Sequence, residues 1–137
     1  MILVDTNVWS ELTRPAPDPS VQKWERDNAT KLCLSTVVIG ELLSGAQMLP
    51  DGKRKQAFLQ GYDILIAAYE ERIVEFDEAA AREYGRVLAF LEKAGRNPAT
   101  SDAQIAAAAL SGGFRLATRN VKDFEGLGIE LINPWDA

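Results

Sequence analysis

The sequence predicts a single α/β domain over residues 1–137, in which a parallel β-sheet is flanked by helices on both faces. The first observation behind this prediction is that short apolar or β-branched runs recur along the chain. They lie at residues 2–4, 32–35, 73–76, 114–118 and 129–132. The second is that stretches with helical spacing separate these runs, an alternation that favours parallel strands. The third is length, because 137 residues can bury a core within one domain.

Helix starts can be assigned in the first half of the chain. The run at 2–4 ends at Asp5, and the segment after this aspartate already has the composition of a helix. Asp18 followed by Pro19 predicts an N-cap and a first helical residue, because proline is pre-organised for that position. In the helix that follows, we expect Val21 and Trp24 to face the core.

Two longer helices are predicted in the second half. Asp77 begins a stretch whose apolar residues recur at helical spacing, at Tyr84, Val87, Leu88 and Leu91. Further on, Ser101 and Gln104 fit a capping box ahead of the run IAAAAL at 105–110. The small side chains of this run would let a helix lie close against the sheet, and we expect Gly112 and Gly113 to end it.

Composition excludes several classes of site. The chain has no histidine, which rules out Ser-His-Asp and Cys-His triads and histidine-containing zinc sites. The single Cys33 can form no intrachain disulfide, so we interpret it as a buried structural thiol in a reducing compartment. The net charge of −5 disfavours tight nonspecific binding to nucleic acid.

A cytoplasmic location without membrane association is expected. The N-terminal segment MILVDT has no positively charged region, and its fifth residue is an aspartate, which is unlike a signal peptide. No apolar run approaches the roughly 20 residues that span a bilayer.

Four acidic residues fall where the predicted fold would gather them. Asp5 follows the first strand, Glu41 lies in the helix after the second, Asp102 lies in the first turn of the alanine-rich helix, and Asp123 follows the fourth strand. Each has an ordinary explanation taken alone, as a helix cap, a dipole partner or a solvated surface charge. Their shared position favours a cluster, because the carboxyl ends of parallel strands and the helix starts converge at one edge of the sheet.

Such a cluster implies a metal ion. Several carboxylates in one cleft repel one another and would take up protons unless a cation neutralised them. Oxygen ligands select hard ions such as Mg²⁺ or Mn²⁺, and Mg²⁺ sites commonly include substrate phosphate oxygens. The acids therefore indicate hydrolysis of a phosphate ester by a metal-activated water.

With these residues in place, the sequence resembles the PIN-domain family of metal-dependent nucleases, and within it the VapC-type toxins of bacterial toxin–antitoxin pairs. Four segments carry the resemblance in the family's order, and together they cover nearly the whole chain. They are ILVDTNVWSEL, LSTVVIGELLSG, NPATSDAQIAAAA and LATRNVKDFEGLGIELINPW. The last is the most specific of them.

The resemblance implies both a site and an activity. Asp5, Glu41 and Asp102 correspond to the family's metal-binding acids, and Asp123 is the expected fourth. Thr6, Thr118 and Asn120 are expected around them; some relatives carry an acid at the position of Asn120, so whether Asp123 or Asn120 lies nearer the metal stays open. The implied activity is Mg²⁺- or Mn²⁺-dependent endoribonuclease cleavage of RNA, often tRNA.

The expected RNA contacts are basic residues beside the acids, namely Arg14, Arg119 and Lys122, each of which also fits an ordinary surface charge. The resemblance further implies a homodimer and a small antitoxin that occludes the acids, with operator DNA bound only through the antitoxin. Trp9, Trp24 and Leu12 fit either a groove or dimer surface or, more simply, the core.

Two alternatives remain open on sequence alone. One is a catalytically silent PIN module that binds RNA or protein, although all four acids are present. The other is a metal-dependent phosphatase similar to haloacid dehalogenases. That family needs a second aspartate two positions after the first, and this position is Asn7 here.

Overall fold

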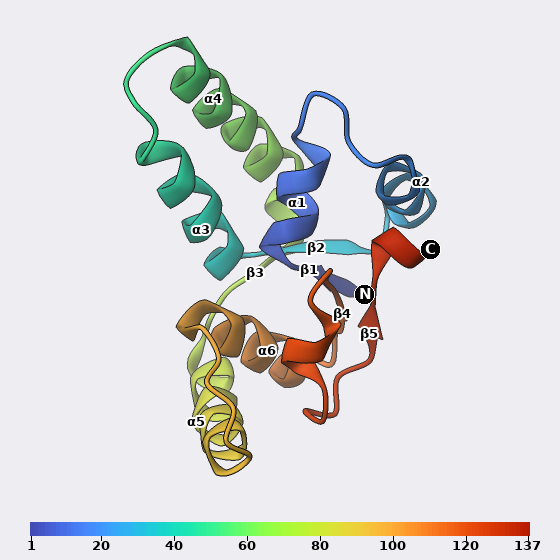
Figure 1. Ribbon diagram of the computed structural model, residues 1–137, viewed down its shortest axis with the longest axis vertical. Coiled ribbons are helices and arrows are strands. Elements are labelled where there is room, and N and C mark those ends of the chain that lie inside the picture. The colour runs from blue at the N-terminus through green and yellow to red at the C-terminus, as the bar shows by residue number, and fades with distance from the viewer.

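A computed structural model describes residues 1–137 as a five-stranded parallel sheet, in the order β3-β2-β1-β4-β5, with helices on both faces (Figure 1). The strands are β1 (Ile2–Val4), β2 (Leu32–Ser35), β3 (Ile73–Val74), β4 (Arg115–Ala117) and β5 (Leu131–Ile132). The α-helices are α1 (Thr6–Leu12), α2 (Pro19–Asn28), α3 (Thr36–Gln47), α4 (Lys53–Ala68), α5 (Glu78–Lys93) and α6 (Thr100–Gly112). Three short 3₁₀ helices complete the chain, namely η1 (Glu70–Arg72), η2 (Val121–Phe124) and η3 (Pro134–Asp136).

The strand order creates a crevice beside the central strand. From β1 the chain moves outward through β2 to β3 with α1 to α4 on one face, and it returns through α5 and α6 on the other face to β4 (Figure 1). The order therefore reverses between β1 and β4, which pair in parallel with Val4 opposite Ala117. In open α/β sheets, ligands bind outside the carboxyl ends of the strands at such a reversal.

The core lies on both faces of the two central strands. All three residues of β1 and all four of β2 are buried, and all of them are apolar except the terminal Ser35. On one face, α6 packs against α5 and β4, and its alanines 106 to 109 are almost completely buried. Trp9 and Trp24 are buried in the core, as the simpler of their two interpretations predicted.

Most of the predicted capping is confirmed. The Asp18 carboxylate accepts hydrogen bonds from the N–H groups of Ser20 and Val21 at 2.8 and 3.4 Å, with Pro19 as the first residue of α2. Asp77 likewise caps α5, and Gly113 ends α6 in the left-handed conformation at φ 68°. No helix in the structure is both long enough and apolar enough to cross a membrane.

Several local predictions are wrong in detail. The runs at 73–76, 114–118 and 129–132 form strands only at 73–74, 115–117 and 131–132. The predicted capping box at Ser101 and Gln104 does not form, because α6 begins earlier, with Ala99 at the N-cap and no side-chain cap. Ser101 lies inside the helix, and its hydroxyl donates to Glu41 instead.

The close approach of α6 to its neighbours generates a stability prediction. Ala107→Leu should lower the free energy of unfolding by about 1–3 kcal/mol, because the added carbons have no space between α6, α5 and the sheet. Ala89→Leu, at an exposed position of α5, is the matched control and should change it by about 0.5 kcal/mol or less. Urea denaturation of both variants measures the difference, and equal effects would contradict the packing argument.

Candidate active site

Asp5 lies at the reversal point of the sheet and is almost fully buried, with 3% of its surface exposed. It follows β1 directly and caps α1, since its Oδ1 accepts from the N–H of Thr6 at 2.8 Å. Its Oδ2 accepts from the hydroxyl of Thr118 at 2.8 Å and from Nδ2 of Asn7 at 3.3 Å. Because Thr118 follows β4, these hydrogen bonds join the ends of the two strands that flank the crevice.

Glu41 reaches the same place from α3. Its Oε1 accepts from the Thr6 hydroxyl at 2.6 Å, and its Oε2 accepts from the Ser101 hydroxyl at 2.9 Å. Glu41 is thus held between α1 and α6 by two neutral donors, which fix the side chain without neutralising its charge. The hydroxyl of Ser101 was missed as a site residue because its sequence signal is that of a cap.

Asp102 completes the group from the first turn of α6. Its side chain makes no hydrogen bond and no ion pair within the protein, and it is only partly buried. Burial, followed by the negative charges of Asp5, Glu41 and Asp123, raises the pKa of Asp102 to about 6. Asp5 and Glu41 both accept hydrogen bonds, so Asp102 has more coordination capacity left for a ligand than either of them.

The pKa of Asp5 is also raised, and burial is the main cause. The hydrogen bonds from Thr118 and Thr6 lower it, whereas the charges of Glu41 and Asp123 raise it further. Carboxylates whose charges raise the pKa values of Asp5 and Asp102 lie close enough to repel them, so proton or cation binding would relieve the repulsion.

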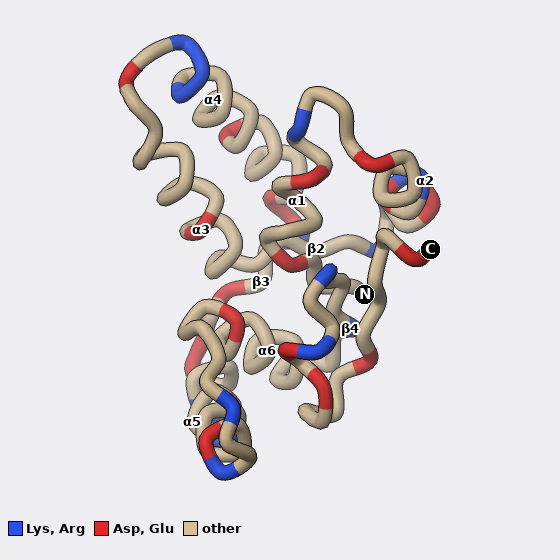
Figure 2. The backbone as a smooth tube through the Cα atoms, viewed as in Figure 1, with Lys and Arg blue, Asp and Glu red and all other residues tan.

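A cleft of about 390 Å³ contains these acids. Figure 2 shows the acidic segments at the start of α1, on α3 and at the start of α6, arranged around the carboxyl edge of the sheet. The lining includes Asp5, Glu41 and Asp102, together with Thr6 and Asn120. Asp123 is exposed in η2 and does not line the cleft, although its charge acts on both other aspartates. Of the two candidates for the fourth position, Asn120 is therefore the one that lines the cleft.

Two of the three predicted basic residues reach the cleft. Arg14 and Arg119 line it, whereas Lys122 is exposed on η2 outside the lining. The Arg119 backbone N–H donates to Oδ1 of Asn7 at 3.2 Å, which ties the loop after β4 to the start of α1.

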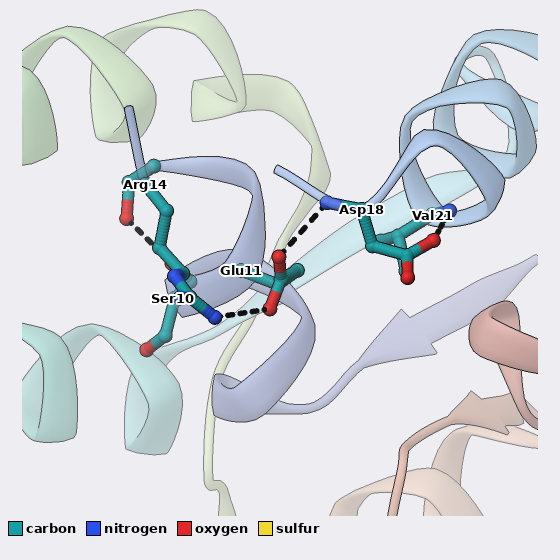
Figure 3. Close-up of polar contacts among 6 residues, drawn as sticks. Ser10, Glu11, Arg14, Asp18 and Val21 are labelled. Carbon is teal, nitrogen blue, oxygen red and sulfur yellow. Dashed lines mark hydrogen bonds and ion pairs between the residues drawn. The ribbon is translucent and has the colours of Figure 1, made fainter. Parts of the chain in front are cut away.

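A buried acid that the sequence analysis did not select fixes Arg14. Glu11 is 7% exposed, pairs with Arg14 at 3.1 Å through Oε1 and accepts from the Asp18 N–H at 2.9 Å through Oε2 (Figure 3). It therefore ties both ends of the loop between α1 and α2 to α1. The spacing of three residues between Glu11, near the end of α1, and Arg14, just beyond that end, was the available signal.

The donor set fits a hard divalent cation. Every ligand candidate in the cleft is an oxygen donor, and no lysine or arginine pairs with Asp5, Glu41 or Asp102. No three of the acidic side chains are arranged to hold one ion directly. Mg²⁺ commonly keeps several waters and uses one or two carboxylates directly, so this arrangement fits an ion bound partly through water.

The chain is similar in sequence to several known proteins. A family model described as PIN domain matches residues 2–128. A plasmid stability protein, StbB, of Pseudomonas syringae pv. tomato is 40% identical, and the match covers 100% of both chains. VapC ribonuclease Y4jK of Sinorhizobium fredii is 37% identical over 99% of both chains.

Solved structures agree with the sequence matches. The crystal structure of FitAcB from Neisseria gonorrhoeae superposes with a TM-score of 0.92 at 32% identity and covers 100% of both chains. VapBC2 from Rickettsia felis, bound to a DNA fragment from its promoter, has a TM-score of 0.80 at 26% identity, over 97% of this chain and 98% of that chain. With a matched family model over nearly its whole length and relatives of this similarity, the chain belongs to the PIN-domain family.

Proposed function

We propose that this protein is a Mg²⁺- or Mn²⁺-dependent endoribonuclease and the toxin of a toxin–antitoxin pair. The observation that carries the proposal is the group of three carboxylates, Asp5, Glu41 and Asp102, in one cleft at the sheet reversal with no basic partner. The name of the relative Y4jK, a VapC ribonuclease, supports RNA as the substrate.

In this proposal each acid has a distinct part. Asp5 and Asp102 would hold the ion, Glu41 would ligate it or orient the attacking water, and Asn120 or Asp123 would complete the site directly or through water. When bound, the ion would lower the pKa of a water and stabilise charge on the phosphate. Thr6, Ser101 and Thr118 hold the acids in place through the hydrogen bonds described above. Since the chain has no histidine, products with 5′-phosphate and 3′-hydroxyl ends are expected.

The RNA backbone would approach over Arg14 and Arg119, with Lys122 contacting it farther from the cleft. A protein of net charge −5 needs local cations of this kind to offset repulsion from phosphate. Arg119 is the more available of the two cleft arginines, because it forms no ion pair, whereas Arg14 pairs with Glu11.

The proposed partner is a small antitoxin that occludes the acids. The similar VapBC2 structure, solved with promoter DNA, supports a partner through which operator DNA is bound. A cationic antitoxin side chain near Asp5 and Asp102 would satisfy the charges that the protein leaves unpaired. We also propose that the protein forms a homodimer and is located in the cytoplasm.

The silent binding module is the second candidate function, and the raised pKa of Asp102 argues against it. A binding module has no need to keep mutually repelling carboxylates in a cleft, because replacing one of them would relieve the repulsion. The phosphatase alternative is disfavoured by Asn7, which is hydrogen bonded to Asp5 and Thr118 where that family needs an acid.

The first functional prediction concerns the acids. Purified protein with Mg²⁺ or Mn²⁺ should cleave labelled RNA, and Asp5→Asn or Asp102→Asn should reduce cleavage at least a hundredfold, because each removes a metal-binding charge. Gel analysis of the products with and without EDTA measures this, and circular dichroism checks that the variants fold. Asp77→Asn, which changes an acid that only caps α5, is the matched control for activity. Cleavage that survives EDTA, or cyclic-phosphate products, would refute the proposal.

The second prediction concerns pH and metal. The pKa of Asp102 is about 6 in the folded protein against an ordinary value of 3.8, so the stabilising protonated form is lost as pH rises through about 6. Without divalent metal at pH 7.5, Asp102→Asn should therefore raise the free energy of unfolding by about 1 kcal/mol, a figure discounted because Asp102 is partly exposed. Near pH 4 this gain should disappear.

Millimolar Mg²⁺ at pH 7.5 should stabilise the native chain and leave Asp102→Asn nearly unchanged. Thermal unfolding by circular dichroism measures all four combinations of protein and metal. Two results together would contradict the assignment of Asp102. They are that Mg²⁺ does not stabilise the native chain and that Asp102→Asn without metal is no more stable than the native chain.

The third prediction concerns the antitoxin. Expression of the chain alone should inhibit bacterial growth, and co-expression of the short reading frame just upstream should relieve the inhibition. Size-exclusion chromatography should show the two proteins together and should also report whether the chain alone is a dimer. If the neighbour neither relieves inhibition nor co-purifies, a solitary RNA-processing nuclease replaces the toxin in the proposal.

A further inference from the structure

We propose that Arg119 and Trp135 form a stacking site for one unpaired nucleobase of the RNA, beside the phosphate to be cleaved. The inference rests on the proposed ribonuclease function and adds a substrate contact to it. The observation behind it is that Trp135 is the one hydrophobic residue in the lining of the acidic cleft. All other lining residues are polar or charged.

The indole of Trp135 is held in place by its neighbours. Its backbone N–H donates to Oδ1 of Asn133 at 3.0 Å, which caps η3, and the adjacent Pro134 is buried. The short helix η3 packs against α2. Trp135 itself is only partly buried. A large flat side chain is thus fixed at the cleft wall while part of its surface stays accessible, although the core offers tryptophan a more favourable place.

Arg119 covers this indole with an accessible cation. The guanidinium carbon lies 4.8 Å from the ring centroid, a cation–π distance. Arg119 forms no ion pair with any acid, including those of the same cleft. Arg119 therefore lies against the Trp135 ring and does not form the salt bridge that the carboxylates of the cleft could offer.

The pair is connected directly to the acid at the centre of the site. The Arg119 backbone N–H donates to Oδ1 of Asn7, and Nδ2 of the same Asn7 donates to Oδ2 of Asp5. Two hydrogen bonds thus separate the stacking pair from the buried carboxylate. A phosphate bound near Asp5 would place a neighbouring base within reach of the pair.

The chemistry of the pair selects a nucleobase over other groups. Aromatic rings and guanidinium planes are the surfaces on which proteins stack unpaired bases, and such stacking tolerates any base because each has a π face. A phosphate would use the charge of Arg119 but would gain nothing from the indole. A paired base in a duplex has both faces covered, so the site would favour single-stranded segments.

The test compares two polyanions, one with bases and one without. Binding is measured for a fluorescein-labelled 12-mer oligoadenylate, and for inorganic polyphosphate as its competitor, with Mg²⁺ and in an Asp102→Asn background that blocks cleavage. Trp135→Ala should weaken oligoadenylate binding about tenfold, while Trp135→Phe, which keeps an aromatic face, should weaken it less than threefold. Polyphosphate binding should be the same in all variants. Phe90→Ala, which removes an exposed aromatic residue on α5, is the matched control and should change neither.

Intrinsic fluorescence gives a readout that does not depend on the alanine variant folding. Trp9 and Trp24 are 3% and 6% exposed, so quenching by added oligoadenylate reports mainly on Trp135. Oligoadenylate should quench the fluorescence of the Asp102→Asn protein, and Trp135→Phe should remove most of this quenching.

Three outcomes would overturn the stacking site. They are unchanged oligoadenylate affinity in Trp135→Ala, an equal loss for oligoadenylate and polyphosphate, and loss of antitoxin binding with RNA binding intact, which would make Trp135 a protein contact. If the native chain cleaves RNA and any of these holds, only the stacking site fails. If the native chain neither binds nor cleaves RNA, both proposals fail together.

Discussion

The buried carboxylate of Asp5 is the constraint around which the site is organised. A charge that is 3% exposed at the end of the central strand costs much free energy unless it accepts several hydrogen bonds. Its donors come from two places, the start of α1 through Thr6 and Asn7 and the end of β4 through Thr118. The alignment of β1 with β4 and the geometry of the site therefore depend on the same hydrogen bonds, so the sheet cannot slip without exposing this charge.

The other acids are held in ways that leave their charge available. Glu41 accepts hydrogen bonds from two hydroxyl groups, and Asp102 accepts none. Paired arginines or lysines would have stabilised these carboxylates better in the resting protein, as Arg14 does for Glu11. Neutral donors instead fix the positions of the carboxylates and leave their repulsion in place, and this repulsion adds to burial, the larger cause, in raising the pKa of Asp102. The fold thus keeps an unfavourable electrostatic interaction that a bound cation would relieve.

Sequence was sufficient wherever local chemistry determines structure. The strands at 2–4 and 32–35 and the caps at Asp18 and Asp77 follow from residues that act on their own neighbours. Sequence was not sufficient where a residue distant in the chain determines the contact. Ser101 has the pattern of a cap, but the unsatisfied carboxylate of Glu41 takes its hydroxyl from another helix. Asn120 rather than Asp123 lines the cleft because Arg96 binds the carbonyls of 122, 123 and 125 and fixes η2, which no local pattern encodes. Trp135 lies after β5, and it lines the cleft only because the strand order places β5 beside β4.

The sign of the cleft's charge connects the metal, the RNA and the antitoxin. Without a cation, three carboxylates outnumber the one arginine of the lining that has no acidic partner, so the cleft attracts a cationic side chain and repels phosphate. A divalent ion would add two positive charges at the carboxylates and cancel this excess of negative charge, so that a phosphate oxygen could approach the ion itself. Under the proposed function, the metal-loaded cleft is the form that binds RNA, and a basic antitoxin residue competes with the ion for the same oxygens. Inhibition would then need no change in fold, because two cations of different origin compete for one group of acids.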